Sequence, residues 1–205
     1  NNFYLSVALI KKNMVYHIGF KKENDSIYKT ELKDSLFEIG SITKTFTSTL
    51  LAEEIVNNNL KETDLINKQF SFKFKNKTKL SYVSLANHTS GLFRLPSNIS
   101  MLIFENPKNP YLKYSIKELE HYLKNELVLD NQTISKFSYS NLGAGLLGQT
   151  LSKKAKKSIE QLTKEKILSK YGMNATSYNV NTSIKGLDKN SSPTSNWDMN
   201  ALKAA

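Results

Sequence analysis

The chain has 205 residues and a formal net charge of +11, from 29 Lys and Arg residues against 18 Asp and Glu residues. It contains no cysteine and no apolar run long enough to cross a membrane, which excludes disulfides, thiolate chemistry and a transmembrane segment in this sequence. The basic residues are scattered and all but Arg94 are lysines, which argues against bidentate readout of bases, so we expect no nucleic-acid partner.

The N-terminal part of the chain is expected to form strands that lead into a helix. Residues 3–20 are typical of a β-hairpin, because two apolar segments are joined by a short polar turn. A third short strand is expected near residues 34–39. A helix should follow from about Ser41 to Asn58, since its apolar residues recur at helical spacing: Ile42, Phe46, Leu50, Leu51, Ile55 and Val56.

The middle of the chain is expected to be mainly helical. Residues 61–80 are polar and poorly patterned, and residues 81–88 are typical of a short helix closed by Gly91. Residues 92–112 are predicted to form a long loop of the kind that often borders a site.

Two capping boxes and a group of glycines mark the later helices. Ser115 with Glu118, and Ser158 with Gln161, have the capping-box spacing and predict two helix starts, the second helix ending near Lys170. The glycines at 143, 145 and 148 lie in an apolar helical segment, where small residues permit close packing. Residues 178–199 are rich in Asn and Ser and are predicted to be loops.

Ser41 and Lys44 stand three positions apart at the start of the first predicted helix, so their side chains share a face. A lysine that faced inward there would lose hydration and release its proton more readily. The resulting neutral amine could activate the serine as a nucleophile. Ser26 and Lys29 repeat the spacing within a polar turn, where a capping serine and a solvated lysine are the simpler interpretation.

Tyr139 and Asn141 form a second pair with chemical potential. Alternate residues of an extended segment point to one side, so the phenol and the carboxamide could face a common site. A phenol can relay a proton, and a carboxamide can hold a lysine amine and a substrate amide together. A packed tyrosine followed by a helix-capping asparagine is the structural alternative.

The two pairs, in this order and about a hundred residues apart, resemble the serine β-lactamase and penicillin-binding-protein superfamily. A Tyr-x-Asn second motif is similar to the class C β-lactamase branch and its relatives. Three further segments resemble that branch: LANHTSGL at 85–92, NPYLKYSIKEL at 109–119 and KYGMNAT at 170–176.

This resemblance implies an α+β, β-lactamase/transpeptidase-like fold, in which helices flank an antiparallel sheet and a mainly helical domain is added. We expect residues 1–60 to begin the sheet domain and carry the nucleophile helix. Residues 61–177 would form the helical domain with the second motif. Residues 178–205 would form a loop-rich segment leading back to the sheet.

By the same resemblance, the expected activity is β-lactam hydrolysis through an acyl-enzyme. Ser41 would be the nucleophile, Lys44 and Tyr139 would move protons, and Asn141 would bind the substrate amide. No cofactor or metal is expected, and the substrate would be a β-lactam or a D-Ala-type peptide. The resemblance also implies a periplasmic or otherwise extracytoplasmic bacterial location, with a signal peptide removed.

The family's third motif, Lys-Thr-Gly or His-x-Gly, has no convincing counterpart. His17-Ile18-Gly19 precedes the nucleophile, and Lys170-Tyr171-Gly172 reads as a helix end. The sequence therefore looks like part of a longer protein, and the missing C-terminal part is an expected partner. Without the oxyanion donor of that motif, these residues alone are expected to be weakly active or inactive.

Three functions stay open on the sequence: a β-lactamase, a D,D-peptidase or esterase of the same fold, and a non-catalytic envelope-binding protein or inactive fragment. The rate of deacylation separates the first two. The sequence also leaves open whether Lys44 or Tyr139 is the main base.

Overall fold

The computed structural model describes residues 3–105, 109, 111–178 and 200–204. These residues divide into two compact units. The described residues up to Glu38 belong to the first unit, and residues 39–178 and 200–204 belong to the second. The division at residues 60 and 177 stays a prediction.

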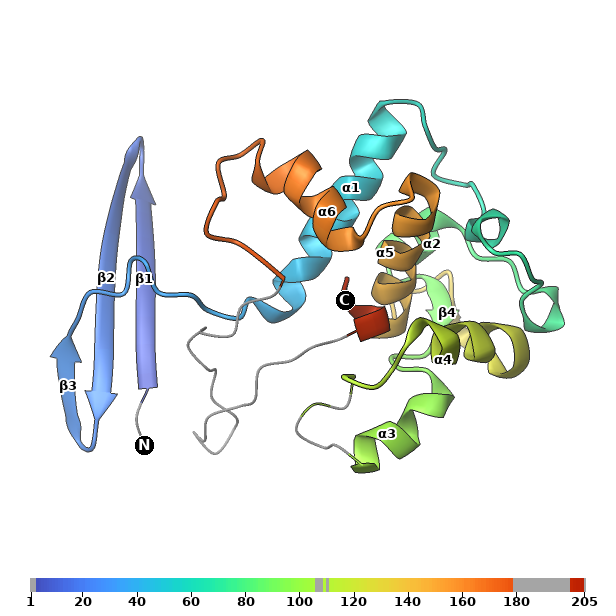
Figure 1. Cartoon of the computed structure of the whole chain (residues 1–205), viewed down its shortest axis with the longest axis horizontal. Coiled ribbons are helices and arrows are strands. Elements are labelled where there is room, and N and C mark those ends of the chain that lie inside the picture. Colours follow the sequence, from blue (N-terminus) through green and yellow to red (C-terminus); the bar gives the residue numbers. More distant parts are fainter. Residues whose placement is uncertain (1–2, 106–108, 110, 179–199, 205) are drawn as a thin grey trace. The chain divides into compact units, whose positions relative to one another are not determined.

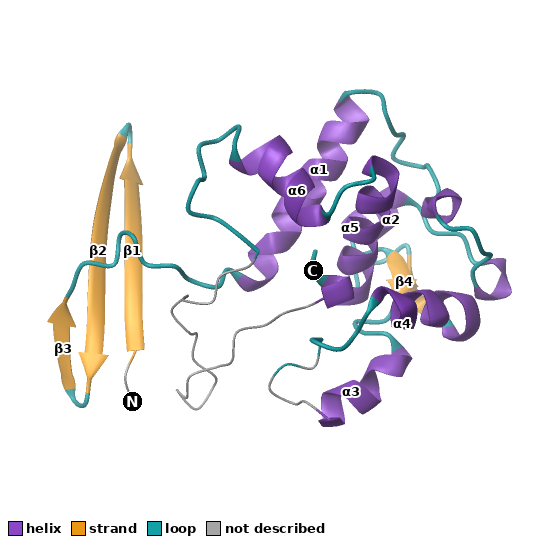
Figure 2. Cartoon of the chain, viewed as in Figure 1, coloured by secondary structure: helices purple, strands orange, loops and turns teal. Residues whose placement is uncertain are grey.

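The first unit is an antiparallel sheet with the order β1-β2-β3 (Figure 2). Strand β1 (Phe3–Lys11) pairs with β2 (Met14–Glu23) from Phe3↔Lys22 to Lys11↔Met14, which confirms the predicted hairpin. Its turn is possible because Lys12 adopts a left-handed conformation, with φ of 56°.

The predicted third strand at 34–39 is wrong. Strand β3 (Ser26–Lys29) lies earlier, because Asn24 (φ 52°) and its neighbour turn the chain directly back onto β2. Asparagine adopts the left-handed conformation more readily than most residues, so the polar stretch before Ser26 is a hairpin turn. Residues 34–39 hold only an isolated bridge position at Phe37.

The second unit is built around helix α5 (Asn141–Ala155), which packs against α1 (Thr43–Val56), α2 (Tyr82–Ala86) and α6 (Ile159–Thr163), as Figure 1 shows. The predicted apolar stripe of α5 is buried: Leu142, Leu146, Leu147 and Leu151 are at most 3% exposed. Because α5 is held in the core by these contacts, Tyr139 and Ser140, which immediately precede it, have a fixed position in this unit.

The second unit contains a helix where a loop was predicted, and a pair of strands that were not predicted. Helix α3 (Ser100–Glu105) lies within the predicted loop 92–112. Strands β4 (Ser90–Leu92) and β5 (Leu129–Ile134) form a two-stranded antiparallel pair. Gly91 bends β4 with φ of +74°, and a Cβ atom there would lie 2.6 Å from the Ile134 side chain. The predicted helix 81–88 is therefore shorter than expected and is followed by a strand.

Short helical turns complete the second unit. Turns of 3-10 type cover Gly40–Ile42, Ile66–Gln69, Lys75–Lys77, Ser97–Ile99 and Asn200–Leu202. Helix α4 (Ile116–His121) continues into a π-helical turn at Tyr122–Glu126, and α6 continues into another at Lys164–Leu168. The predicted loop 178–199 lies outside the described residues except for Tyr178.

The predicted capping boxes are present at the starts of α4 and α6. Ser158 accepts a hydrogen bond from the Gln161 backbone N–H at 3.2 Å, and the Gln161 side chain accepts one from the Ser158 N–H at 3.0 Å. The box at Ser115 and Glu118 has the same reciprocal pattern. Both serines therefore fix helix starts, as their spacing predicts.

Replacing Ser158 by alanine should lower the free energy of unfolding by about 1 kcal/mol, because the N–H of Gln161 loses its acceptor. Urea denaturation followed by circular dichroism measures this change. The matched control is Ser169→Ala, which alters an exposed serine beyond the same helix and should leave the midpoint nearly unchanged. An equal shift in both variants would contradict the capping role.

Candidate active site

Ser41, Lys44 and Tyr139 lie together in the second unit. The Tyr139 hydroxyl donates a hydrogen bond to Ser41 Oγ at 2.7 Å, and Lys44 Nζ donates to the same oxygen at 3.0 Å. Lys44 Nζ also lies 4.8 Å from the centroid of the Tyr139 ring. The serine hydroxyl therefore contacts two groups that can exchange protons with it.

Local backbone structure explains how residues so distant in sequence meet. Ser41 lies in the 3-10 turn that leads into α1, and Lys44 lies in the first turn of that helix, on the same face. Tyr139 lies two residues before α5 begins. Ser140, the N-cap of α5, accepts a hydrogen bond from the Gly143 N–H at 2.8 Å and donates one to the Phe93 carbonyl at 2.8 Å.

The side chains of this segment alternate in direction. Ser140 is 1% exposed and its hydroxyl is engaged inside the core, whereas the Tyr139 phenol turns toward Ser41. The buried serine thereby anchors the backbone that presents the tyrosine.

His88 contacts one side of Tyr139. The two ring centroids are 4.8 Å apart at an interplanar angle of 32°. The Ser140 backbone N–H donates a hydrogen bond to His88 Nδ1 at 3.1 Å, which fixes this nitrogen as an acceptor and Nε2 as the protonated nitrogen of the neutral ring. Burial and then the charge of Lys44 lower the pKa of His88, so the ring is neutral near pH 7. Its acceptor lone pair is occupied by the Ser140 N–H, so the ring holds the backbone next to Tyr139.

Tyr139 experiences opposing electrostatic effects. Partial burial raises the pKa of its phenol, but hydrogen bonding with Lys44 and Ser41 and the charges of Lys44 and Arg94 outweigh this effect. The pKa of Tyr139 therefore lies below the usual value of 10.0. The phenol is thus more easily ionised than an ordinary tyrosine.

Two sequence expectations need adjustment at this site. Lys44 is half-buried, so it is less desolvated than a lysine facing fully inward. Asn141 is buried, and its amide donates to the Tyr111 hydroxyl at 3.3 Å, while its Oδ1 has no hydrogen-bond partner among the described residues. The described structure gives Asn141 no hydrogen bond to Lys44, so it lies beside the trio without joining it.

Sequence reasoning missed Arg94 and Tyr111. The guanidinium carbon of Arg94 lies 5.0 Å from the centroid of the Tyr139 ring. Arg94 is the only arginine among 29 basic residues, and this could have singled it out as a candidate site residue. In the sequence analysis, the scarcity of arginine serves only as an argument against nucleic-acid binding. No sequence feature distinguishes Tyr111 from the other tyrosines, and its contact with Asn141 depends on tertiary structure.

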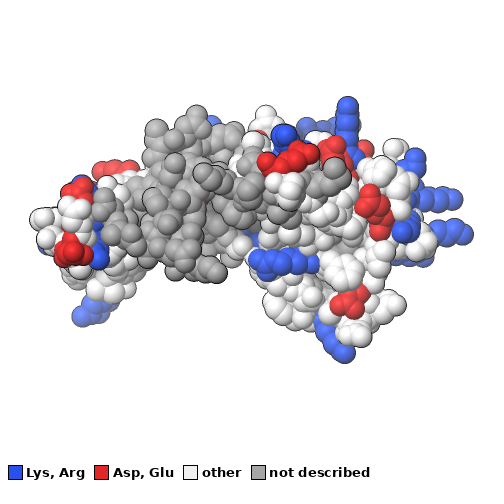
Figure 3. Space-filling view, turned by 90° about the horizontal axis from the view of Figure 1, so that it is seen from below, with Lys and Arg blue, Asp and Glu red and all other residues white. Residues whose placement is uncertain are grey.

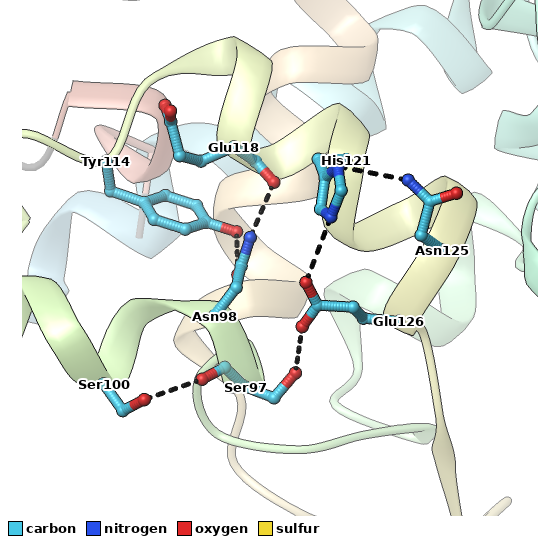
Figure 4. Close-up of polar contacts among 8 residues, drawn as sticks. All are labelled: Ser97, Asn98, Ser100, Tyr114, Glu118, His121, Asn125 and Glu126. Carbon is cyan, nitrogen blue, oxygen red and sulfur yellow. Dashed lines mark hydrogen bonds and ion pairs between the residues drawn. The ribbon is translucent and has the colours of Figure 1, made fainter.

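A second polar cluster lies elsewhere in this unit (Figure 4). It surrounds a cavity of about 440 Å³ lined by Asn98, Lys117, Glu118, His121 and Glu126. Glu126 accepts a hydrogen bond from Ser97 at 2.8 Å and pairs with His121 at 3.3 Å. Asn98 donates to the Glu118 carbonyl at 2.9 Å and accepts from Tyr114 at 3.0 Å. These contacts connect the loop before α3 to α4 and its π turn, which is a structural role.

Other kinds of site find little support in the described part of the chain. No described helix has the length and apolar character needed to cross a bilayer. Within the same residues, no group of three or more His, Cys, Asp or Glu could hold a metal ion. On the face in Figure 3, blue basic and red acidic side chains are interspersed over the helical unit. Ion pairs in this unit include Lys153–Glu120 at 2.9 Å. The positive charge on this face is dispersed.

Comparisons with known proteins identify the family of this chain. The family model for β-lactamases matches residues 5–202. A β-lactamase of Providencia stuartii is 28% identical over 178 residues, which cover 86% of this chain and 42% of the relative. The chain thus spans less than half the length of this relative.

Two solved structures have similar folds. The β-lactamase/D-alanine carboxypeptidase of Yersinia pestis, complexed with citrate, has a TM-score of 0.65 and 25% identity, over 86% of this chain and 50% of its own. A class C β-lactamase in complex with cefoxitin has a TM-score of 0.68 and 24% identity, over 97% of this chain and 54% of its own. The chain belongs to the β-lactamase family and has the fold shared by class C β-lactamases and their relatives.

Proposed function

We propose that the protein is a serine hydrolase that opens β-lactams through an acyl-enzyme on Ser41. The observation that supports this most is the pair of hydrogen bonds to Ser41 Oγ, from Tyr139 at 2.7 Å and from Lys44 at 3.0 Å. If Tyr139 is ionised, Ser41 donates this hydrogen bond to the phenolate instead. The contact between Tyr139 and Ser41 then provides the path along which the serine loses its proton.

In the proposed acylation, Ser41 Oγ attacks the lactam carbonyl carbon and its proton passes to the Tyr139 phenolate. The C–N bond then breaks, and Tyr139 returns the proton to the leaving nitrogen. In deacylation, water attacks the ester carbonyl and gives its proton to the Tyr139 phenolate. The ester C–O bond then breaks, and Tyr139 passes this proton to Ser41 Oγ, which leaves as a hydroxyl. Lys44 stabilises the serine oxygen through its hydrogen bond to Ser41 Oγ and lies beside the Tyr139 ring, where it favours the phenolate.

Tyr139 is the better candidate for the base because its pKa is lowered by groups already in place. A phenol that ionises more easily is more often present as the phenolate that can accept the serine proton. We also propose that Asn141 binds the substrate amide. Its Oδ1 has no hydrogen-bond partner among the described residues but is buried, so this role requires the oxygen to become accessible when substrate binds. The backbone N–H of Ser41 is proposed as one oxyanion donor.

A D,D-peptidase is the second candidate, because the Yersinia pestis relative is described as both a β-lactamase and a D-alanine carboxypeptidase. Both activities use the same acylation step and differ in how quickly the β-lactam ester is hydrolysed. An extracytoplasmic location is proposed with either activity, because their cell-wall and antibiotic substrates are met there.

Ser41→Ala should abolish covalent labelling of the protein by a fluorescent penicillin, because the variant has no hydroxyl to acylate. Intact-mass spectrometry of the full-length protein after penicillin treatment measures the adduct. Ser26→Ala is the matched control, since it removes the other serine with the same spacing to a lysine and should label normally. Labelling that survives in Ser41→Ala would refute the assignment.

The wild-type spectrum also separates the candidate functions. A persistent adduct supports the peptidase, and a turned-over product without a persistent adduct supports the β-lactamase. No reaction at all would contradict both.

A further inference from the structure

Hydrogen bonds to backbone carbonyls connect the loop that carries Arg94 to the segment that follows Tyr139, the candidate base. The carbonyl of Arg94 accepts a hydrogen bond from the Leu142 N–H at 3.1 Å, and the preceding carbonyl, of Phe93, accepts one from Ser140 Oγ at 2.8 Å. Both donors belong to the start of α5, immediately after Tyr139. These two hydrogen bonds therefore fix the loop that carries Arg94 next to the segment that carries Tyr139, where the guanidinium meets the ring.

The side chain at this position has properties that suit a fixed charge. Arginine keeps its proton at all ordinary pH values, and its planar guanidinium stacks on aromatic rings. The guanidinium carbon lies 5.0 Å from the Tyr139 ring centroid, a distance at which a cation is attracted to a ring. A cation there stabilises a phenolate more than a phenol.

Three basic side chains face Tyr139 from three different elements. Lys44 approaches from α1, His88 from the residues after α2, and Arg94 from the residues after β4. His88 is neutral near pH 7 because its pKa is lowered, so it adds no charge. Lys44 is occupied with Ser41 Oγ. Arg94 is thus a second cation, and it leaves the contact between Tyr139 and Ser41 untouched.

We propose that Arg94 is a positioning residue whose guanidinium holds Tyr139 in its proton-accepting, anionic form. This inference rests on the proposed function, in which Tyr139 is the base for Ser41. The direction in which Arg94 shifts the pKa of Tyr139 agrees with it.

A different role for Arg94 would be to bind a substrate carboxylate directly, since the side chain is exposed. The two roles predict different measurements. A residue that acts on Tyr139 changes the ionisation of that phenol without any substrate present. A carboxylate-binding residue leaves the phenol unchanged and raises KM for anionic substrates at every pH.

The test is the titration of Tyr139 in the full-length protein labelled with tyrosine carrying ¹³C at Cζ, whose NMR signal is assigned by its loss in Tyr139→Phe. Arg94→Gln should lower the acid dissociation constant of Tyr139 about two- to fivefold, because it removes one cation–π contact. Arg94→Lys should restore part of the effect. Lys170→Gln is the matched control, since Lys170 Nζ lies 5.8 Å from the Tyr171 ring centroid and its loss should leave Tyr139 unchanged.

The kinetic counterpart is the rate of Ser41 acylation by penicillin as a function of pH. In Arg94→Gln this rate should fall two- to fivefold below the pKa of Tyr139 and match the wild type above it. An unchanged Tyr139 titration, or a loss of rate that is equal at every pH, would overturn the proposal while acylation of Ser41 continued. If the wild type is never acylated but Tyr139 responds to Arg94→Gln, the proposed function fails and the coupling stands.

Discussion

Tyr139→Phe should lower the rate of Ser41 acylation by about 10²–10⁴-fold, the usual contribution of a positioned general base. The ring and its stacking on His88 are retained in this variant, so the loss reports on the hydroxyl alone. Stopped-flow measurement with nitrocefin gives the rate. Tyr171→Phe is the matched control, because Tyr171 is 66% exposed and has no place in the proposed mechanism.

The pH dependence of the same rate identifies the base. A tyrosine acts as a base only after it has lost its proton, so the wild-type rate should rise with pH through the pKa of Tyr139, which lies below 10.0. This ascending limb should disappear in Tyr139→Phe. In Lys44→Met the limb should persist and move to higher pH, because a cation that favours the phenolate is gone. A limb that survives in Tyr139→Phe but is lost in Lys44→Met would make Lys44 the base.

Gly148→Val should lower the free energy of unfolding by about 1–3 kcal/mol, the usual cost of overpacking a filled core. A Cβ atom on Gly148 would lie 2.0 Å from the Cβ of Ala204, and one on Gly145 would lie 2.7 Å from Leu202. Residues 200–204 are also held by hydrogen bonds, including that from Thr47 to the Ala204 carbonyl at 2.9 Å. The larger side chain must therefore displace this segment from α5.

Chemical denaturation of the variant and of a matched control measures this cost. Gly143→Ala changes a glycine of the same helix, where the nearest atom to a new Cβ is Ser140 Oγ at 3.3 Å. Alanine also favours helix more than glycine does, so this control should be close to neutral. If Gly148→Val is as stable as Gly143→Ala, the tight contact with residues 200–204 does not exist in solution.

The sequence predicted those features that depend on local pattern. The hairpin, the helix after Ser41, the capping boxes and the close packing of the α5 glycines follow from alternation, helical spacing and residue type, and the structure confirms them. The meeting of Ser41 with Lys44 also follows from helix geometry, since the two residues lie within one turn.

Features that depend on long-range contacts were not predictable in this way. Strands β4 and β5 are short and pair across about 40 residues of chain, so neither has a strong pattern of its own. The third strand lies earlier than predicted because β3, with only the four residues Ser26–Lys29, is too short to show a clear alternation after the turn at Asn24-Asp25. Arg94 was missed at the site because its partner ring lies far along the sequence.

The alternation of Tyr139, Ser140 and Asn141 has a consequence for how this segment tolerates changes of length. Adding or removing a single residue just before Tyr139 would exchange the two sides of the chain. The phenol would then compete for the space of a side chain that is 1% exposed, and the small hydroxyl of Ser140 would point at Ser41. A change of one residue in length here should therefore abolish the chemistry, even when every side chain is kept.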